Sequence, residues 1–175
     1  NVSCPNVAGG IDFGTDPRAC FDVVSGIRAA VEIPLITKLT PNVTSIASIA
    51  KAAQEAGSDA VSCINTVLGM VVDWRKQRPV LANRVGGLSG PAIKPIALRC
   101  VYQVASQVNI PIIGIGGIAC IDDVMEFLVT GASAVQIGTA NYYDPTLCTR
   151  LIDQLPHAVQ ELKASSLQQI IKSLH

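Results

Sequence analysis

Short apolar runs alternate along the chain with longer segments in which apolar residues recur at helical spacing. Residues 33–39 and 110–117 contain β-branched runs opened by a proline, a pattern typical of parallel strands that are covered on both faces. After a helical segment, each run is followed by a strand of small residues that begins with a glycine, at 57–66 and 131–139. The pattern therefore predicts two similar strand–helix–strand units.

Helices are expected around these strands, at about residues 17–31, 44–56, 92–107 and 121–130, with further helices at the C-terminal end. Thr44 opens one of them, and Asp122 and Asp123 open another, where such residues cap free N–H groups and suit the helix dipole. Strands that alternate with helices imply right-handed βαβ units and a parallel sheet.

The strand count favours part of a barrel. Four full strands, with a strand end at residues 1–6, make about half of an eight-stranded barrel, which typically needs about 250 residues. We therefore predict an α/β fold in which residues 1–175 form the C-terminal part (about strands 4–8) of a single (β/α)8 TIM-barrel domain. A doubly wound open sheet also fits the count, but no GxGxxG fingerprint follows a first strand.

Residues 66–91 interrupt the alternation. This segment holds Trp74 and several basic residues, followed by a glycine-rich stretch at 86–91. The sequence assigns it neither helix nor strand, and a loop of that length in a compact domain is usually functional or mobile.

Charge and composition narrow the class of protein. Thirteen Lys and Arg balance thirteen Asp and Glu, so nothing favours nucleic acid or an anionic membrane as a partner. The chain has no run of about 18 apolar residues and no leader pattern, so we expect a soluble cytoplasmic protein. The six cysteines form no CxxC pair and no metal-ligand spacing; we expect all but Cys4 to be small core residues in a reducing compartment.

Two glycine turns are candidates for anion binding. Gly116 and Gly117 end one late strand, and Gly138 and Thr139 end the next. In barrels, the loops after the last two strands commonly hold a phosphate on backbone N–H groups, and glycine lets the backbone approach the anion. The alternative is a pair of ordinary strand-to-helix turns.

Other strand ends carry polar chemistry. Lys38 ends an apolar strand, where it could support a cofactor's charge, form a Schiff base, or point outward at the barrel rim. Asn65 and Thr66 offer an amide and a hydroxyl suited to a polar heterocycle. Cys4 could act as a general base, although a lone cysteine beside a proline is more often structural.

Taken together, the motifs resemble dihydroorotate dehydrogenase over about residues 1–155. The segments that carry the resemblance are Asn1-Val2-Ser3-Cys4-Pro5-Asn6-Val7, Lys38-Leu39-Thr40-Pro41-Asn42, Ile64-Asn65-Thr66 and Gly86-Gly87-Leu88-Ser89-Gly90-Pro91-Ala92-Ile93-Lys94-Pro95. Within that family the chain is most similar to the class 1B catalytic subunit, on the evidence of residues 13–17 and 65–70.

The resemblance implies oxidation of dihydroorotate to orotate with FMN, in pyrimidine biosynthesis. It implies that Cys4 takes the proton from C5 and that hydride passes from C6 to the flavin. The implied substrate-binding residues are Asn1, Asn6, Asn65 and Thr66. The implied FMN-binding residues are Asn1, Lys38, Ile64, Gly90, Gly116, Gly117, Gly138 and Thr139. No metal site is expected.

The class 1B resemblance also implies partners. Such subunits work with an electron-transfer subunit that carries FAD and a [2Fe-2S] cluster and passes electrons to NAD, and we expect a homodimer at the core of this assembly. Because the chain begins with Asn1, inside a motif, we also expect a fragment that lacks the first barrel strands and is inactive by itself.

Three alternatives remain open at this stage. The first is the pyrimidine-reducing domain of dihydropyrimidine dehydrogenase, which shares some motifs but typically has His in place of Asn6. The second is a phosphate-binding barrel lyase that uses Lys38 as a Schiff base. The third is a non-enzymatic fragment.

Overall fold

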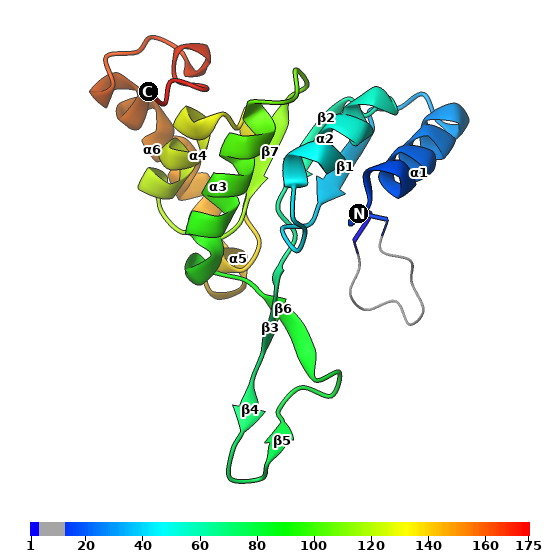
Figure 1. Ribbon diagram of the computed structural model, residues 1–175. Coiled ribbons are helices and arrows are strands. Elements are labelled where there is room, and N and C mark those ends of the chain that lie inside the picture. The colour runs from blue at the N-terminus through cyan, green and yellow to red at the C-terminus, as the bar shows by residue number, and fades with distance from the viewer. Residues whose placement is uncertain (4–12) are drawn as a thin grey trace.

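The computed structural model describes residues 1–3 and 13–175 and contains a parallel sheet with helices packed against it (Figure 1). The sheet has the order β1-β2-β7-β8, and all neighbouring pairs are parallel. Its strands are β1 (Ile36–Leu39), β2 (Ala60–Cys63), β7 (Ile112–Ile115) and β8 (Ala134–Gln136). The predicted parallel α/β architecture is confirmed, with each strand shorter than the apolar pattern suggested. Residues 1–3 contain no strand.

The main helices fall close to the predicted positions. They are α1 (Pro17–Ala30), α2 (Ile46–Glu55), α3 (Lys94–Ala105), α4 (Ile121–Thr130), α5 (Ala140–Tyr143) and α6 (Leu147–Glu161). Two short 3-10 helices, η1 (Pro91–Ile93) and η2 (Leu167–Gln169), complete the set within the described residues.

Local chemistry explains the helix ends. The Asp16 carboxylate accepts a hydrogen bond from the N–H of Ala19 at 2.8 Å, and Pro17 occupies the first position of α1, where its missing N–H does no harm. Ser45 caps α2, one residue beyond the predicted Thr44. Gly131 follows α4 at a φ of 128°, which favours glycine, and thereby ends the helix.

The core lies between the sheet and the helices α2, α3 and α4 (Figure 1). Phe127 of α4 is fully buried and packs over Gly114 of β7, where a Cβ atom would collide with its ring. Leu39 and Val61 are also fully buried. Apolar burial of this kind holds the four strands in place, and with them the strand ends that carry the polar residues.

Residues 67–88 form an arm that projects away from the sheet (Figure 1). The arm consists of two antiparallel ladders, β3 (Val67–Met70) with β6 (Val85–Leu88) and β4 (Val72–Asp73) with β5 (Arg78–Pro79). The sequence assigned no strand to this segment, so its ordered hairpin structure was missed. The arm exposes many large apolar side chains, among them Met70, Val72, Trp74 and Val80.

The cysteines divide into two groups. Cys20, Cys63 and Cys100 are buried core residues, as predicted. Cys120 and Cys148 are exposed, which corrects the prediction that they belong to the core. Cys120 lies at the N-cap of α4 and Cys148 in the first turn of α6, positions that face away from the apolar layer.

Among the described residues, none of the helices is both long and apolar enough to cross a membrane.

Candidate functional site

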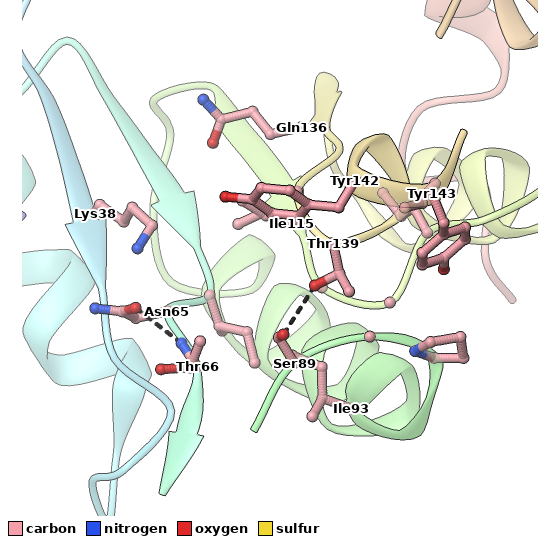
Figure 2. Close-up of a pocket in the computed structure, with 18 residues that line it drawn as sticks. Lys38, Asn65, Thr66, Ser89, Ile93, Ile115, Gln136, Thr139, Tyr142 and Tyr143 are labelled. Atoms are coloured by element: carbon pink, nitrogen blue, oxygen red, sulfur yellow. Dashed lines mark hydrogen bonds between the residues drawn. The ribbon is translucent and has the colours of Figure 1, made fainter. Parts of the chain in front are cut away.

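A cavity of about 220 Å³ opens at the carboxyl ends of the parallel strands. Its lining comes from the ends of β1, β2, β7 and β8 and from the segment that joins the arm to α3 (Figure 2). In parallel α/β folds, the carboxyl ends of the strands are where ligands bind. The chain therefore presents one site where such folds place their chemistry.

Nine residues singled out from the sequence line this cavity together. They are Lys38, Ile64, Asn65, Thr66, Gly90, Gly116, Gly117, Gly138 and Thr139. Asn1 lies beside it, because Asn65 Nδ2 donates to Asn1 Oδ1 at 3.2 Å. Cys4 and Asn6 lie outside the described residues.

Lys38 extends from β1 toward the middle of the cavity (Figure 2). It is half-buried and stands in register with Ser62 of β2, so the two side chains project from the same face of the sheet. Ser62 is buried, and its hydroxyl donates to Gln136 Oε1 of β8 at 2.9 Å, across the intervening strand β7. Lys38, Ser62 and Gln136 thus form a polar layer across the sheet, and Lys38 and Gln136 both line the cavity.

The side chain of Asn65 is held by several hydrogen bonds at once. Besides Asn1, its Nδ2 donates to the Ser3 carbonyl at 2.7 Å, and its Oδ1 accepts from the N–H of Thr66 at 2.9 Å. Asn42 supports the same turn, since its Nδ2 donates to the Thr66 carbonyl and its Oδ1 accepts from the N–H of Leu68. A fixed amide of this kind can present a hydrogen-bonding pattern to a polar ring without first paying ordering entropy.

The glycine turns differ in the space that they leave. Gly116 and Gly117 have φ of 140° and 78°, and a Cβ atom on either would clash with neighbouring atoms of the protein. Around Gly138, in contrast, no atom beyond its own residue and its two chain neighbours lies within 4 Å of the position that a Cβ would take. The first two glycines are therefore required by packing, whereas Gly138 leaves open space beside the backbone that a ligand can approach.

Thr139 links the Gly138 turn to the segment between β6 and η1, because Thr139 Oγ1 donates to Ser89 Oγ at 2.8 Å (Figure 2). Backbone N–H groups, two hydroxyls and glycine backbones at the ends of β7 and β8 suit a phosphate group. The open space beside Gly138 favours anion binding over the alternative of an ordinary strand-to-helix turn. The residues present thus fit a phosphate-bearing cofactor.

Sequence reasoning missed several lining residues. They are Ser89, Pro91, Ile93, Ile115, Ile118, Gln136, Ala140, Tyr142 and Tyr143. Ser89 belongs to the Gly86–Pro95 motif, but nothing in the sequence connects it with Thr139, which is 50 residues further along the chain. Gln136 could have been found from its position at the polar end of a small-residue strand, as Lys38 was.

The buried thiols are poor candidates for proton transfer. Burial raises the pKa of Cys20 to about 11, and burial together with the nearby Cys100 raises the pKa of Cys63 further. Both therefore remain protonated at neutral pH. Within residues 1–3 and 13–175, no group of three or more His, Cys, Asp or Glu residues could hold a metal ion.

Comparison with known proteins connects this site to a family. The family model for dihydroorotate dehydrogenase matches residues 1–159. The catalytic subunit of dihydroorotate dehydrogenase B (NAD(+)) from Enterococcus faecalis is 51% identical over 175 residues, which cover 99% of this chain and 56% of that protein. The subunit of the same name from Listeria innocua is 51% identical, with 99% of this chain and 58% of the relative covered. The chain thus spans little more than half the length of these relatives.

Proposed function

The chain belongs to the dihydroorotate dehydrogenase family, and we propose that it supplies the active-site half of an enzyme that oxidises dihydroorotate to orotate with FMN. The observation that carries this proposal is the convergence of nine residues, indicated by strand-end patterns or by the family resemblance, on one cavity at the carboxyl ends of four parallel strands. These residues come from five segments that are far apart in the sequence, so their meeting at one site is not a consequence of local proximity.

We propose that the complete barrel contains further strands. In the described part of the chain, β1 and β8 are the two edges of the sheet, and Ile36 of β1 is 47% exposed. Four strands are half of the eight that close a barrel, and the chain covers 56% of the Enterococcus faecalis relative. Additional strands would pair with both edges and cover this apolar surface. The isolated chain would then be inactive and poorly soluble.

In this proposal the pyrimidine ring is held by Asn1, Asn6, Asn65 and Thr66. The hydrogen bonds that already fix the Asn65 amide support this role, since they orient it before a substrate arrives. Cys4 would act as the base that takes the proton from C5 of dihydroorotate. Bound FMN would supply the acceptor for the hydride that leaves C6.

Lys38 would place a positive charge beside the flavin ring, where negative charge develops as the ring is reduced. Its register with Ser62 and its half-buried position support this role over that of a rim lysine, since a rim lysine would point away from the cavity. Ile64 would pack against the ring. Gly90 would also pack against FMN, and the turns at Gly116, Gly117, Gly138 and Thr139 would hold its phosphate.

A partner subunit is also part of the proposal. The relatives are named as catalytic subunits of an NAD(+)-linked enzyme. We propose that this protein likewise forms a homodimer that works with an electron-transfer subunit containing FAD and a [2Fe-2S] cluster.

The base role of Cys4 can be tested by mixing the full-length flavoprotein with dihydroorotate and following loss of flavin absorbance in a single turnover. Cys4→Ala should slow this step by about 100-fold or more, because general-base catalysis contributes on that scale. Cys148→Ala, which removes an exposed thiol on α6, serves as the matched control and should reduce at the wild-type rate. An undiminished rate in Cys4→Ala would exclude Cys4 as the base.

A further inference from the structure

Lys94 is the first residue of α3 and follows directly on η1, which contributes Pro91 and Ile93 to the cavity. Its ammonium group turns away from the cavity toward α4. There Lys94 Nζ lies 2.6 Å from Asp123 Oδ1 and 2.8 Å from Glu126 Oε2. The side chains of Lys94 and Asp123 are only 25% and 10% exposed, so this ion pair is partly shielded from water.

The second oxygen of Asp123 is also occupied. Asp123 Oδ2 accepts the N–H groups of Ala119 at 2.7 Å and Cys120 at 3.0 Å. These two residues end the turn that follows β7 and contains Gly116 and Gly117. One carboxylate therefore holds the end of the β7 turn on one side and the start of α3 on the other.

The two segments also touch directly. A Cβ atom on Gly117 would lie 2.9 Å from the carbonyl oxygen of Gly90, from the backbone nitrogen of Lys94 and from Lys94 Cβ. Both Gly90 and Gly117 have positive φ, at 86° and 78°, a conformation that glycine adopts without strain. The backbone contact sets the closest approach of the two turns, and the ion pair keeps them from moving apart.

Both partners are held in their charged forms. Hydrogen bonds to Asp123 and Glu126 raise the pKa of Lys94 above its ordinary value. Burial raises the pKa of Asp123, but hydrogen bonds from Lys94 and from the N–H of Ala119 outweigh it and leave that pKa below its ordinary value. The pair is therefore ionised throughout the neutral range.

We propose that the Lys94–Asp123 ion pair is a positioning clamp, which fixes the spacing between the Gly90 turn and the Gly116–Gly117 turn and so tunes the site for a flavin that carries a phosphate. Lys94 does not line the cavity, so it acts through these turns and not as a ligand. The inference rests on the proposed function, namely that the Gly116–Gly117 turn holds the phosphate of FMN and that Gly90 packs against FMN. It adds that a residue outside the cavity sets the preference for a phosphorylated flavin.

The test compares the affinity of the full-length apoprotein for FMN and for riboflavin, which lacks the phosphate, by quenching of flavin fluorescence. Lys94→Met should raise the Kd for FMN by about 10-fold, while the Kd for riboflavin stays within about 2-fold of the wild-type value. The ratio of the two constants should therefore fall. A role in overall stability alone would move both constants together.

Two further variants sharpen the result. Lys94→Arg keeps the charge and should retain most of the preference for FMN. Lys51→Met removes an exposed lysine of α2 whose nitrogen is 4.0 Å from Glu55, and it should change neither constant. If Lys94→Met does not fold, Lys94→Gln gives the same comparison, because it removes the charge but keeps a polar side chain opposite Asp123.

The outcomes separate the two claims. Equal losses of FMN and riboflavin, or no loss of either, would overturn the clamp while leaving the proposed function intact. A wild-type protein that binds neither flavin would refute the proposed function, and the clamp with it. A selective loss of FMN that Lys94→Arg restores is the result that supports the clamp.

Discussion

The parallel sheet and the arm use similar apolar residues and bury them very differently. In the sheet, Leu39 and Val61 are completely buried beneath the helices, whereas Trp74 and Val80 in the arm are 70% and 60% exposed. The sheet is held by apolar burial on the helix side, and the arm by backbone hydrogen bonds between its own strands. Within one chain, then, apolar content alone does not indicate which segments stabilise the fold, because apolar residues stabilise it only where another layer covers them.

The largest effect on the free energy of unfolding is expected in the core between the sheet and its helices. Phe127→Ala should lower the free energy of unfolding by about 3–5 kcal/mol, since Phe127 is fully buried over Gly114 and its loss leaves a cavity. Urea denaturation of the full-length protein, followed by circular dichroism, measures this change. A loss below about 1 kcal/mol would mean that the helix layer can collapse into the space, and that the sheet is less tightly packed than the structure indicates.

An intermediate effect on the free energy of unfolding is expected for Asp123 of α4, and this effect should depend on pH. Because the pKa of Asp123 is lowered in the folded protein, its stabilising contribution is present above the ordinary aspartate value of about 4 and is lost as the pH falls through the lowered pKa. Asp123→Asn should therefore be less stable than wild type at neutral pH, and the difference should shrink as the solution is acidified. Unfolding free energies measured over this range test the expectation.

Asp153 gives a matched control for that experiment. It lies exposed on α6 and belongs to none of the ion pairs described above, so Asp153→Asn should change the free energy of unfolding by no more than about 0.5 kcal/mol. If the difference in unfolding free energy between wild type and Asp123→Asn stayed constant into strong acid, the charge of the Asp123 carboxylate would not be the source of its stabilising effect.

The smallest effect on the free energy of unfolding is expected for substitutions in the arm. Trp74→Ala should change the free energy of unfolding by no more than about 0.5 kcal/mol, because the indole is mostly exposed and its contact is with the neighbouring Arg75 side chain, 4.3 Å from the ring centre. The measurement is the same urea denaturation, made on dilute protein. A loss comparable with that of Phe127→Ala would show that the arm packs against another surface and would remove the contrast with the sheet.

Much of the framework could be predicted from the sequence because it rests on local patterns. Apolar runs bounded by Pro and Gly marked all four parallel strands, and capping residues such as Asp123 marked a helix start. Since the carboxyl ends of parallel strands meet at one edge, Lys38, Asn65 and Gly116 could be expected together before their positions were known. The roles of Cys4 and Asn6, which lie outside the described residues, stay predictions.

The arm escaped prediction for a physical reason. A strand is recognised from the alternation of buried and exposed side chains, but Leu68 and Met70 on β3 are exposed, while the intervening Gly69 has no side chain to bury. The sequence of β3, Val67-Leu68-Gly69-Met70, therefore does not alternate between apolar and polar residues. Its order comes from pairing with residues 85–88, which local pattern does not report.

The sequence by itself determined the order of the four parallel strands and the main helices, the polar strand ends and the family, because each depends on patterns in neighbouring residues. Only the tertiary structure decided which distant groups meet. Ser62 bonds to Gln136, Thr139 to Ser89, and Lys94 to Asp123, over separations of 74, 50 and 29 residues. Such partnerships depend on strand register and on the approach of two turns, and these are fixed when the helix layer packs on the sheet.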